Sequence, residues 1–256
     1  MVKCRQAGRQ AGVTLFRGDC LSVMKQIASG SIDMILADLP FGITSCKWDM
    51  RIPTAPLWME YLRVLKENGP ALLFATQPFA TDLINAARKL FRYELIWDKK
   101  AVTGFLNVHK MPMRRHENIL VFYRSLPCYN PPGLRACEKN KNGQRKTDAY
   151  GGSWKSGWVT KITGWPQSIQ AFPLGGLGRQ ENGPATKPVE LLEFLIRTYS
   201  RPGDLVLDNC MGGGNTAIAA ARSGRRFIGI EKDGCRFRMA ATRIVRARRR
   251  PCPRVV

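Results

Sequence analysis

The chain has 256 residues, of which 44% are hydrophobic, and this is enough apolar material for the core of one sizeable domain. Lys and Arg number 41 against 19 Asp and Glu, and the formal net charge of +22 makes a polyanion the first partner to consider. No apolar run is long enough to cross a bilayer, and no two of the eight cysteines form a Cys-x-x-Cys pair. We therefore predict a reduced, cytoplasmic protein with no membrane association and no metal site.

Apolar runs with strand character alternate along the chain with segments of helical periodicity. The predicted strands are Ile32–Ala37, Ala71–Ala75, Leu95–Trp97, Ile119–Tyr123, Leu205–Leu207 and Phe227–Ile230. The predicted helices are Leu57–Lys66, Phe79–Lys89, Pro188–Thr198 and Ala217–Arg222. This alternation predicts an α/β fold with a doubly wound, Rossmann-like and largely parallel sheet.

The stretch between about Ser125 and Gln180 has a different composition, with Gly, Lys, Arg, Asn and isolated aromatic residues and no clear periodicity. We predict that it is an insertion that takes no part in the sheet. At the other end, Arg243–Arg254 is predicted to be a solvated basic tail.

The first candidate site stands where the strand that begins near Ile32 ends. An acid, a proline and an aromatic residue follow the apolar run, as Asp38, Leu39, Pro40 and Phe41. From this tetrapeptide alone, an ordinary strand-end turn with a core aromatic residue is about as plausible as a reactive site.

The second candidate site is a glycine turn near the C-terminus. A short apolar strand ends at Asp208, the cluster Gly212–Gly214 follows, and an Ala-rich helix comes next. Glycines let the backbone approach a ligand closely, and a helix N-terminus offers free N–H groups. Glu231, at the end of the next strand, is placed to bind ribose hydroxyls. No Gly-Lys-Ser/Thr follows, which disfavours a triphosphate loop, but a nicotinamide cofactor remains open on this motif alone.

Together, the two motifs resemble those of the amino-group DNA methyltransferases. Asp38 to Phe41 is similar to the family's Asp-Pro-Pro-Tyr, and Asp208 to Thr216 is similar to its Asp-Pro-Phe-Met-Gly-Ser-Gly-Thr-Thr. The catalytic strand precedes the cofactor turn. This order resembles that of the circularly permuted beta class of site-specific adenine-N6 methyltransferases from phages and bacteria. This order implies an enzyme in the cytoplasm of a bacterial or phage-infected cell.

The resemblance implies S-adenosylmethionine as the cofactor and double-stranded DNA as the substrate, with the target adenine flipped out of the helix. Asp38 and the backbone carbonyl of the Leu39–Pro40 segment would accept the two N–H bonds of the amino group, and Phe41 would stack on the base. The implied cofactor-binding residues are Asp19, Lys187, Asp208, Gly212, Gly214, Thr216 and Glu231. Phe74–Phe79, Trp97–Lys99 and Thr103–Asn107 resemble segments that line the target-base pocket.

The resemblance also implies a division of the chain. Residues 1–124 are the catalytic half of the methyltransferase domain, 125–182 the target-recognition insertion, 183–245 the cofactor-binding half, and 246–256 the basic tail. The insertion interleaves cations with aromatic residues, which suits phosphate contacts and unstacked bases. These are Lys139, Lys141, Arg145, Lys146, Lys155 and Lys161 with Tyr150, Trp154, Trp158 and Trp165.

The chain departs from the family pattern at Leu39 and Phe41 in the catalytic motif and at Gly213 and Asn215 in the cofactor turn. Two alternatives therefore stay open: an N4-cytosine methyltransferase, and a catalytically silent DNA-binding descendant. A cytosine ring-carbon enzyme would use Pro127-Cys128, but it places its cofactor turn first, and here that turn is last. A homodimer and a restriction partner both remain open.

Overall fold

The computed structural model describes residues 5–6, 12–46, 48–141, 158–174 and 186–249. Among the helices of these residues, none is long and apolar enough to pass through a membrane. The chain divides into two compact units, one made of residues 1–130 and 168–256 and the other of residues 131–167. The larger unit contains both candidate sites.

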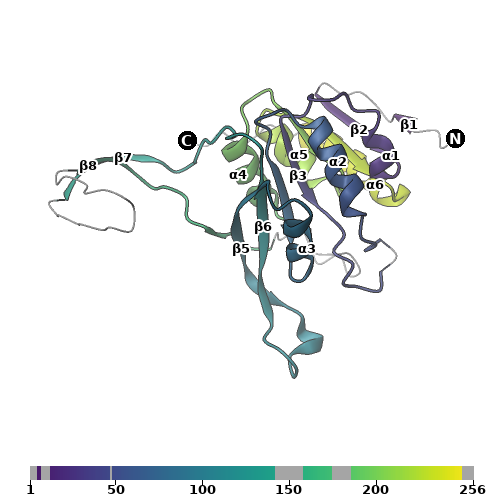
Figure 1. Cartoon of the computed structure of the whole chain (residues 1–256), viewed down its shortest axis with the longest axis horizontal. Helices are drawn as coiled ribbons and strands as arrows, with labels where there is room; N and C mark the ends of the chain where they lie inside the picture. The colour runs from purple at the N-terminus through teal and green to yellow at the C-terminus, as the bar shows by residue number, and fades with distance from the viewer. Residues whose placement is uncertain (1–4, 7–11, 47, 142–157, 175–185, 250–256) are drawn as a thin grey trace. The chain divides into compact units, whose positions relative to one another are not determined.

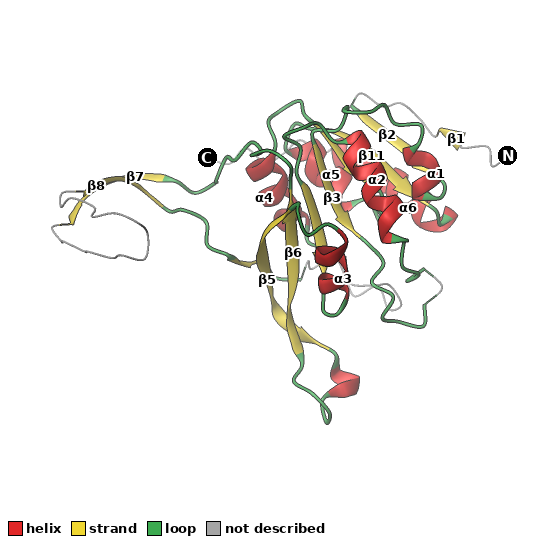
Figure 2. Ribbon diagram, in the orientation of Figure 1, coloured by secondary structure: helices red, strands yellow, loops and turns green. Residues whose placement is uncertain are grey.

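A nine-stranded sheet runs through the larger unit (Figures 1 and 2). The strand order is β1-β2-β11-β10-β3-β4-β6-β5-β9. Its strands are β1 (Arg5–Gln6), β2 (Val13–Arg17), β3 (Met34–Asp38), β4 (Ala71–Ala75), β5 (Phe91–Thr103), β6 (Arg114–Phe122), β9 (Ile169–Ala171), β10 (Leu205–Asp208) and β11 (Arg226–Glu231). From β2 to β4 the neighbouring strands are parallel, whereas β6 is antiparallel to both β4 and β5.

Helices cover both faces of this sheet. They are α1 (Cys20–Met24), α2 (Thr54–Val64), α3 (Phe79–Ala86), α4 (Val189–Tyr199), α5 (Asn215–Arg222) and α6 (Gly234–Arg249). Alternate residues of β3 enter two separate cores: Met34 and Leu36 pack with α4, α5 and α6, and Ile35 and Ala37 pack with α1, α2 and α3. A strand that is buried on both faces reads as a continuous apolar run, and this explains why the doubly wound fold was predictable.

Three elements differ from the sequence-based predictions. β5 and β6 are much longer than their apolar cores, since together with the 3₁₀ helix η1 (Phe105–Asn107) they form an extended hairpin with polar and exposed residues. The prediction that the stretch from Ser125 to Gln180 takes no part in the sheet is wrong at β9, which pairs in parallel with β5. Short edge strands gain their stability from a neighbour, so β9 has no periodic signature of its own.

The predicted basic tail is also partly wrong, because α6 continues to Arg249 and includes residues that were assigned to the tail. Residues 250–256 lie outside the described part of the chain. The many arginines hid the apolar stripe of this helix, of which Phe237, Ala240 and Ile244 are buried.

The smaller unit contains the antiparallel pair β7 (Arg135–Lys141) and β8 (Trp158–Thr163). It falls within the predicted insertion. Several residues predicted to contact DNA, such as Arg145, Lys146, Tyr150, Trp154 and Lys155, lie outside the described residues.

Candidate active site

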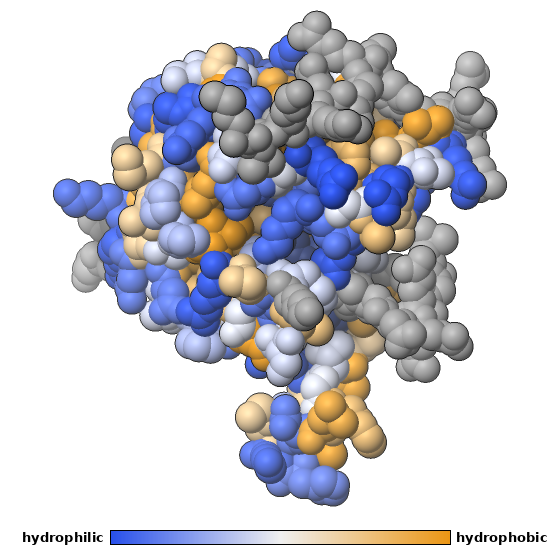
Figure 3. All heavy atoms as spheres, turned by 90° about the vertical axis from the view of Figure 1, so that its right-hand side faces the viewer, coloured by the Kyte–Doolittle hydropathy of each residue, from blue (hydrophilic) through white to orange (hydrophobic). Residues whose placement is uncertain are grey.

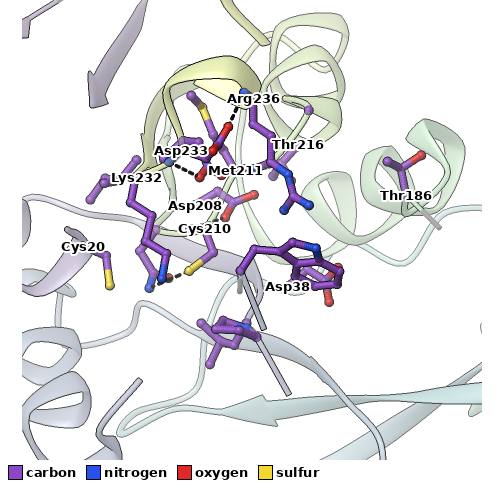
Figure 4. A pocket seen from close by; sticks show the side chains of 18 of the residues that line it. Cys20, Asp38, Thr186, Asp208, Cys210, Met211, Thr216, Lys232, Asp233 and Arg236 are labelled. Carbon is purple, nitrogen blue, oxygen red and sulfur yellow. Dashed lines mark hydrogen bonds between the residues drawn. The ribbon is translucent and has the colours of Figure 1, made fainter. Parts of the chain in front are cut away.

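A cavity of about 860 Å³ opens at the carboxyl ends of the parallel strands (Figure 4). Asp38, Asp208 and Glu231 are the last residues of β3, β10 and β11, which are neighbours in the sheet. Parallel strands end at one edge, so the fold gathers three carboxylates from distant parts of the chain around one space. The volume is in the range of small-molecule sites.

Almost all predicted site residues line this cavity. They are Asp19, Asp38, Leu39, Pro40, Phe41, Lys187, Asp208, Gly212, Thr216 and Glu231. Gly214 does not line it. Gly214 has a φ of 81°, and a Cβ there would lie 3.0 Å from the Cβ of Ala240 on α6, so this glycine permits the turn and the close packing of α6.

Lys187, which lies just before α4, forms ion pairs with β3 and β6. Its Nζ lies 2.7 Å from Oδ2 of Asp38 on β3 and 3.1 Å from Oε2 of Glu117 on β6. Burial lowers the pKa of Lys187, but the two carboxylates outweigh it and raise the pKa above its usual value. Burial raises the pKa of Asp38, and the lysine opposes this rise. The lysine therefore remains charged and favours the ionised form of Asp38.

Aromatic rings surround the same ammonium group. Nζ of Lys187 lies 5.7 Å from the ring centre of Phe41, 5.1 Å from that of Phe74 and 5.9 Å from that of Trp97. Ring faces attract a cation, so these rings stabilise the ammonium group where it lies. Phe41 also packs on Phe79, with ring centres 5.5 Å apart. Phe41 is thus a half-buried ring beside Asp38, as stacking on a base requires.

The loop after Phe41 is fixed by the buried carboxylate of Asp49. This group accepts hydrogen bonds from the N–H groups of Gly42, Ile43 and Thr44 at 2.8, 3.0 and 2.8 Å. Burial raises the pKa of Asp49, but these hydrogen bonds outweigh it and hold the pKa below its usual value. Arg51 donates to the carbonyl of Phe41 at 2.8 Å. The segment after the catalytic motif therefore orients that motif.

The glycine turn forms hydrogen bonds with the acid of the next strand. Gly212, with a φ of 50°, donates its N–H to Oε2 of Glu231 at 3.0 Å. The other oxygen of Glu231 accepts from the N–H of Asp233 at 2.8 Å. Each carboxylate oxygen has two lone pairs, so both oxygens can still accept hydroxyl protons. Asp19 caps α1 through Ser22 at 3.0 Å and likewise retains acceptor capacity toward the cavity.

Behind the turn, Asn209 occupies the position of the family's proline. It is buried, and its Oδ1 accepts a hydrogen bond of 2.6 Å from the hydroxyl of Tyr61 on α2. Burial raises the pKa of Tyr61 well above its usual value, so the tyrosine remains a donor. This pair connects the cofactor turn to the opposite helical layer.

Sequence reasoning missed the role of Arg243 on α6. Its guanidinium donates to the carbonyl of Gly213 and, at 2.6 Å, to Oδ1 of Asn215. Asn215 in turn donates to the carbonyl of Lys187 at 2.7 Å. Gly213 and Asn215 thus share Arg243 as a hydrogen-bond partner. The one feature of the sequence that could have indicated this role is Gly213, which is smaller than the family's serine and leaves room for the arginine.

The segments predicted to line the target-base pocket lie mostly elsewhere. Trp97 is buried in the core and Phe105 is exposed, and neither borders the cavity. Lys99 is connected to Lys187 only through Glu117, because its Nζ lies 3.5 Å from Oε1 of that glutamate.

The cavity suits a cationic nucleoside-type ligand. Burial, with a smaller contribution from Asp38 and Glu231, raises the pKa of Asp208 to about 7. Positive charge brought into this space would be stabilised by the carboxylates around it. The glycine turn, a helix N-terminus and Glu231 provide N–H donors and a hydroxyl acceptor on the same wall. These residues fit the sulfonium and ribose of S-adenosylmethionine.

The sequence profile of a family described as DNA methylase matches residues 32–242. The chain is 28% identical over 246 residues to the DNA adenine methyltransferase YhdJ of Escherichia coli strain K12, covering 90% of this chain and 82% of that protein. Its fold is similar to PvuII DNA methyltransferase (cytosine-N4-specific), with a TM-score of 0.67, 15% identity and coverage of 99% and 91% of the two chains. It is also similar to the M1.HpyAVI–SAM complex, with a TM-score of 0.59, 19% identity and coverage of 90% and 98%.

Proposed function

Since this chain belongs to the N6/N4 DNA methylase family, we propose that it transfers a methyl group from S-adenosylmethionine to the N6 amino group of adenine in double-stranded DNA. The observation that carries the proposal is the position of Asp38. Its carboxylate stands at the end of β3, in the same cavity as the glycine turn and Glu231. An amino-group acceptor and a nucleoside-type cofactor site therefore share one space.

The chemistry of the target explains why a carboxylate is needed there. An exocyclic amine conjugated to a base is a poor nucleophile, because its lone pair is delocalised into the ring. Asp38 accepts one N–H of the amine, and the backbone carbonyl of the Leu39–Pro40 segment accepts the other. These two hydrogen bonds draw the lone pair out of the ring plane, and Phe41 stacks on the base. When bound, S-adenosylmethionine would supply the electrophilic methyl group; its sulfur would leave with the bonding electron pair as a thioether, and the methylated nitrogen would release one proton, for which the hydrogen-bonded carboxylate of Asp38 is the adjacent acceptor.

Lys187 holds Asp38 ready for this role. The ion pair of 2.7 Å favours a carboxylate that accepts hydrogen bonds over a neutral acid that donates one. Only one oxygen of Asp38 is engaged by the lysine, so the other is available to the amine. Glu117 forms a second ion pair with the same lysine. Gly212, Thr216 and Glu231 bind the cofactor on the adjoining wall.

Adenine is preferred over cytosine as the target for two reasons. The relative that is 28% identical over most of both chains is named a DNA adenine methyltransferase. The catalytic tetrapeptide also begins with an acid, whereas enzymes that act on cytosine N4 more often begin it with serine. We further propose that the catalytic half precedes the cofactor half, as in the beta class, that residues 125–182 select the DNA sequence, and that the enzyme works in a bacterial or phage-infected cytoplasm.

The test is transfer of isotopically labelled methyl from S-adenosylmethionine to unmethylated duplex DNA, followed by nucleoside digestion and mass analysis. Labelled N6-methyladenine is the expected product. N4-methylcytosine would instead establish the cytosine alternative, since the two reactions share a mechanism. DNA binding without any transfer would indicate a silent descendant. Sequencing the methylated DNA would then give the recognition sequence.

A further inference from the structure

The β5–β6 hairpin extends past the edge of the sheet at which Asp38 stands. Asp38 pairs with Phe74 of β4, and Phe74 pairs with Ile119 of β6. The residues of β6 before Asn118 and those of β5 after Ile96 therefore continue beyond this edge. The hairpin advances about 7 Å between the Asp98–His116 pair and the Thr103–Arg114 pair, because β6 spans this interval with two residues of about 3.3 Å each, and η1 continues beyond it. The hairpin thus projects on the side where the target base must arrive.

The end of this hairpin is apolar and exposed. Phe105 and Leu106, in η1, are 75% and 94% exposed. Further exposed apolar side chains of the hairpin are Val102, Val108, Met111 and Met113. Hydrophobic atoms lie beside hydrophilic ones on the projection at the bottom of Figure 3, which corresponds to the end of the hairpin in Figure 1. Such a concentration at the end of a projecting element indicates a partner that accepts apolar side chains.

The charges around these apolar residues identify the class of partner. From Lys100 to His116 there is no acidic residue, whereas the same segment holds Lys100, Lys110, Arg114 and Arg115. Arg115 and Lys100 are held in place by Asp98, at 2.8 and 3.1 Å. Apolar side chains surrounded by cations suit a base stack bordered by phosphates, and suit a second copy of this basic chain poorly.

The stem of the hairpin is firmly connected to the active site. Thr103 donates to the carbonyl of Arg114 at 3.1 Å and accepts from Lys99 at 3.0 Å. Lys99 forms an ion pair with Glu117, and Glu117 forms one with Lys187, which is also paired with Asp38. The hairpin end therefore has a defined position relative to the carboxylate that receives the amine.

We infer that the end of the β5–β6 hairpin is a DNA wedge: Phe105 and Leu106 enter the base stack beside the target and stabilise the duplex from which that base has been flipped. This inference rests on the proposed function, because it assigns the hairpin to the opening of DNA for the Asp38 site. Insertion of apolar side chains offsets the loss of stacking, and the cations of the stem contact the flanking phosphates.

The test compares the wild-type chain with the double variant Phe105→Ser/Leu106→Ser. Both side chains are exposed, so the fold does not depend on them. Met59→Ser, an equally exposed change on α2 away from the cavity, is the matched control. Methyl transfer is measured on a duplex with the mapped target adenine normally paired, and on one with an abasic site opposite it, where the base is already unpaired.

The double variant is expected to lose about tenfold or more in kcat/KM on the paired duplex, to recover most of this on the abasic-opposed duplex, and to keep wild-type cofactor affinity. Equal activity of the variant and wild type on the paired duplex, or an equal loss on both duplexes, would overturn the wedge. A change from dimer to monomer by light scattering with unaltered methylation would assign the hairpin to self-association instead. If wild type transfers no methyl group, the proposed function fails, and the wedge is then tested by duplex affinity, which the double variant must weaken and the control must not.

Discussion

The ionisation of Asp208 differs between the folded and the unfolded chain. Its side chain is buried, and it accepts the N–H of Cys210 at 3.0 Å. Burial, with a smaller contribution from the neighbouring carboxylates, raises its pKa to about 7, against an ordinary value of 3.8. Between these two pH values the unfolded chain releases the proton while the folded chain retains it. The contribution of Asp208 to stability is therefore present below about pH 4 and is lost as the pH rises toward 7.

The prediction for Asp208→Asn follows from this sign. The ligand-free variant is expected to be more stable than wild type at pH 8, by a few kcal/mol at most, and the difference is expected to shrink steadily as the pH is lowered to 5. Urea unfolding at several pH values measures it. A difference that is the same at every pH would show that the carboxyl is not held protonated.

Site residues were predictable from the sequence where they are the last residues of apolar strands. Asp38, Asp208 and Glu231 each follow an apolar run, and parallel strands bring such ends together whatever their separation along the chain. Lys187 and Gly214 show the limit. The resemblance placed both at the cofactor, but only the three-dimensional packing reveals that Lys187 pairs with Asp38 and that Gly214 faces α6.

At the scale of elements, α6 supports the cofactor turn through Arg243. A Cβ at position 213 would lie 2.8 Å from Nη1 of this arginine, so a side chain there would displace the guanidinium from its hydrogen bonds to Gly213 and Asn215. Gly213→Ser is therefore expected to weaken S-adenosylmethionine binding in the wild-type chain.

The same substitution is expected to be much less harmful in an Arg243→Met background, because the flexible methionine leaves room for the serine. Arg243→Met alone loses two hydrogen bonds and is expected to weaken binding roughly five- to thirtyfold. Calorimetric titration of all four chains gives the coupling. Equal effects of Gly213→Ser in both backgrounds would show that the two residues are independent.

Elements whose apolar residues recur with a helix or strand period were predictable from the sequence. Elements that are stabilised mainly by pairing with a neighbouring strand were not. Ala71–Ala75 appears with the predicted bounds, and the predicted α4 is displaced by one residue. The outer parts of β5 and β6 escaped prediction, because a hairpin that projects from the sheet has no buried face and hence no alternation. The same holds for β9, a three-residue strand at the sheet edge.

At the scale of the whole molecule, charge determines how the chain meets DNA. A formal net charge of +22 gives a strong attraction to phosphates, and binding releases condensed counterions. Affinity for duplex DNA is therefore expected to fall at least about a hundredfold between 50 and 200 mM salt. Fluorescence anisotropy with a labelled duplex measures this slope. An affinity that does not respond to salt would mean that phosphate contacts contribute little.

The order of the two sites along the whole chain was visible in the sequence, and the family match over residues 32–242 bears out the DNA methylase assignment. The boundaries of the target-recognition insertion remain predictions. The base that the insertion selects depends on side-chain positions that composition does not encode.

The central claim is that Asp38 accepts a hydrogen bond from the target amine in a site where the cofactor binds independently of it. Methyl transfer to duplex DNA by wild type and by Asp38→Asn, at saturating S-adenosylmethionine, tests this most directly when cofactor affinity is measured alongside. We predict a loss of transfer of at least about a hundredfold with unchanged cofactor affinity. Transfer at the wild-type rate, or a loss that merely follows weakened cofactor binding, would contradict it.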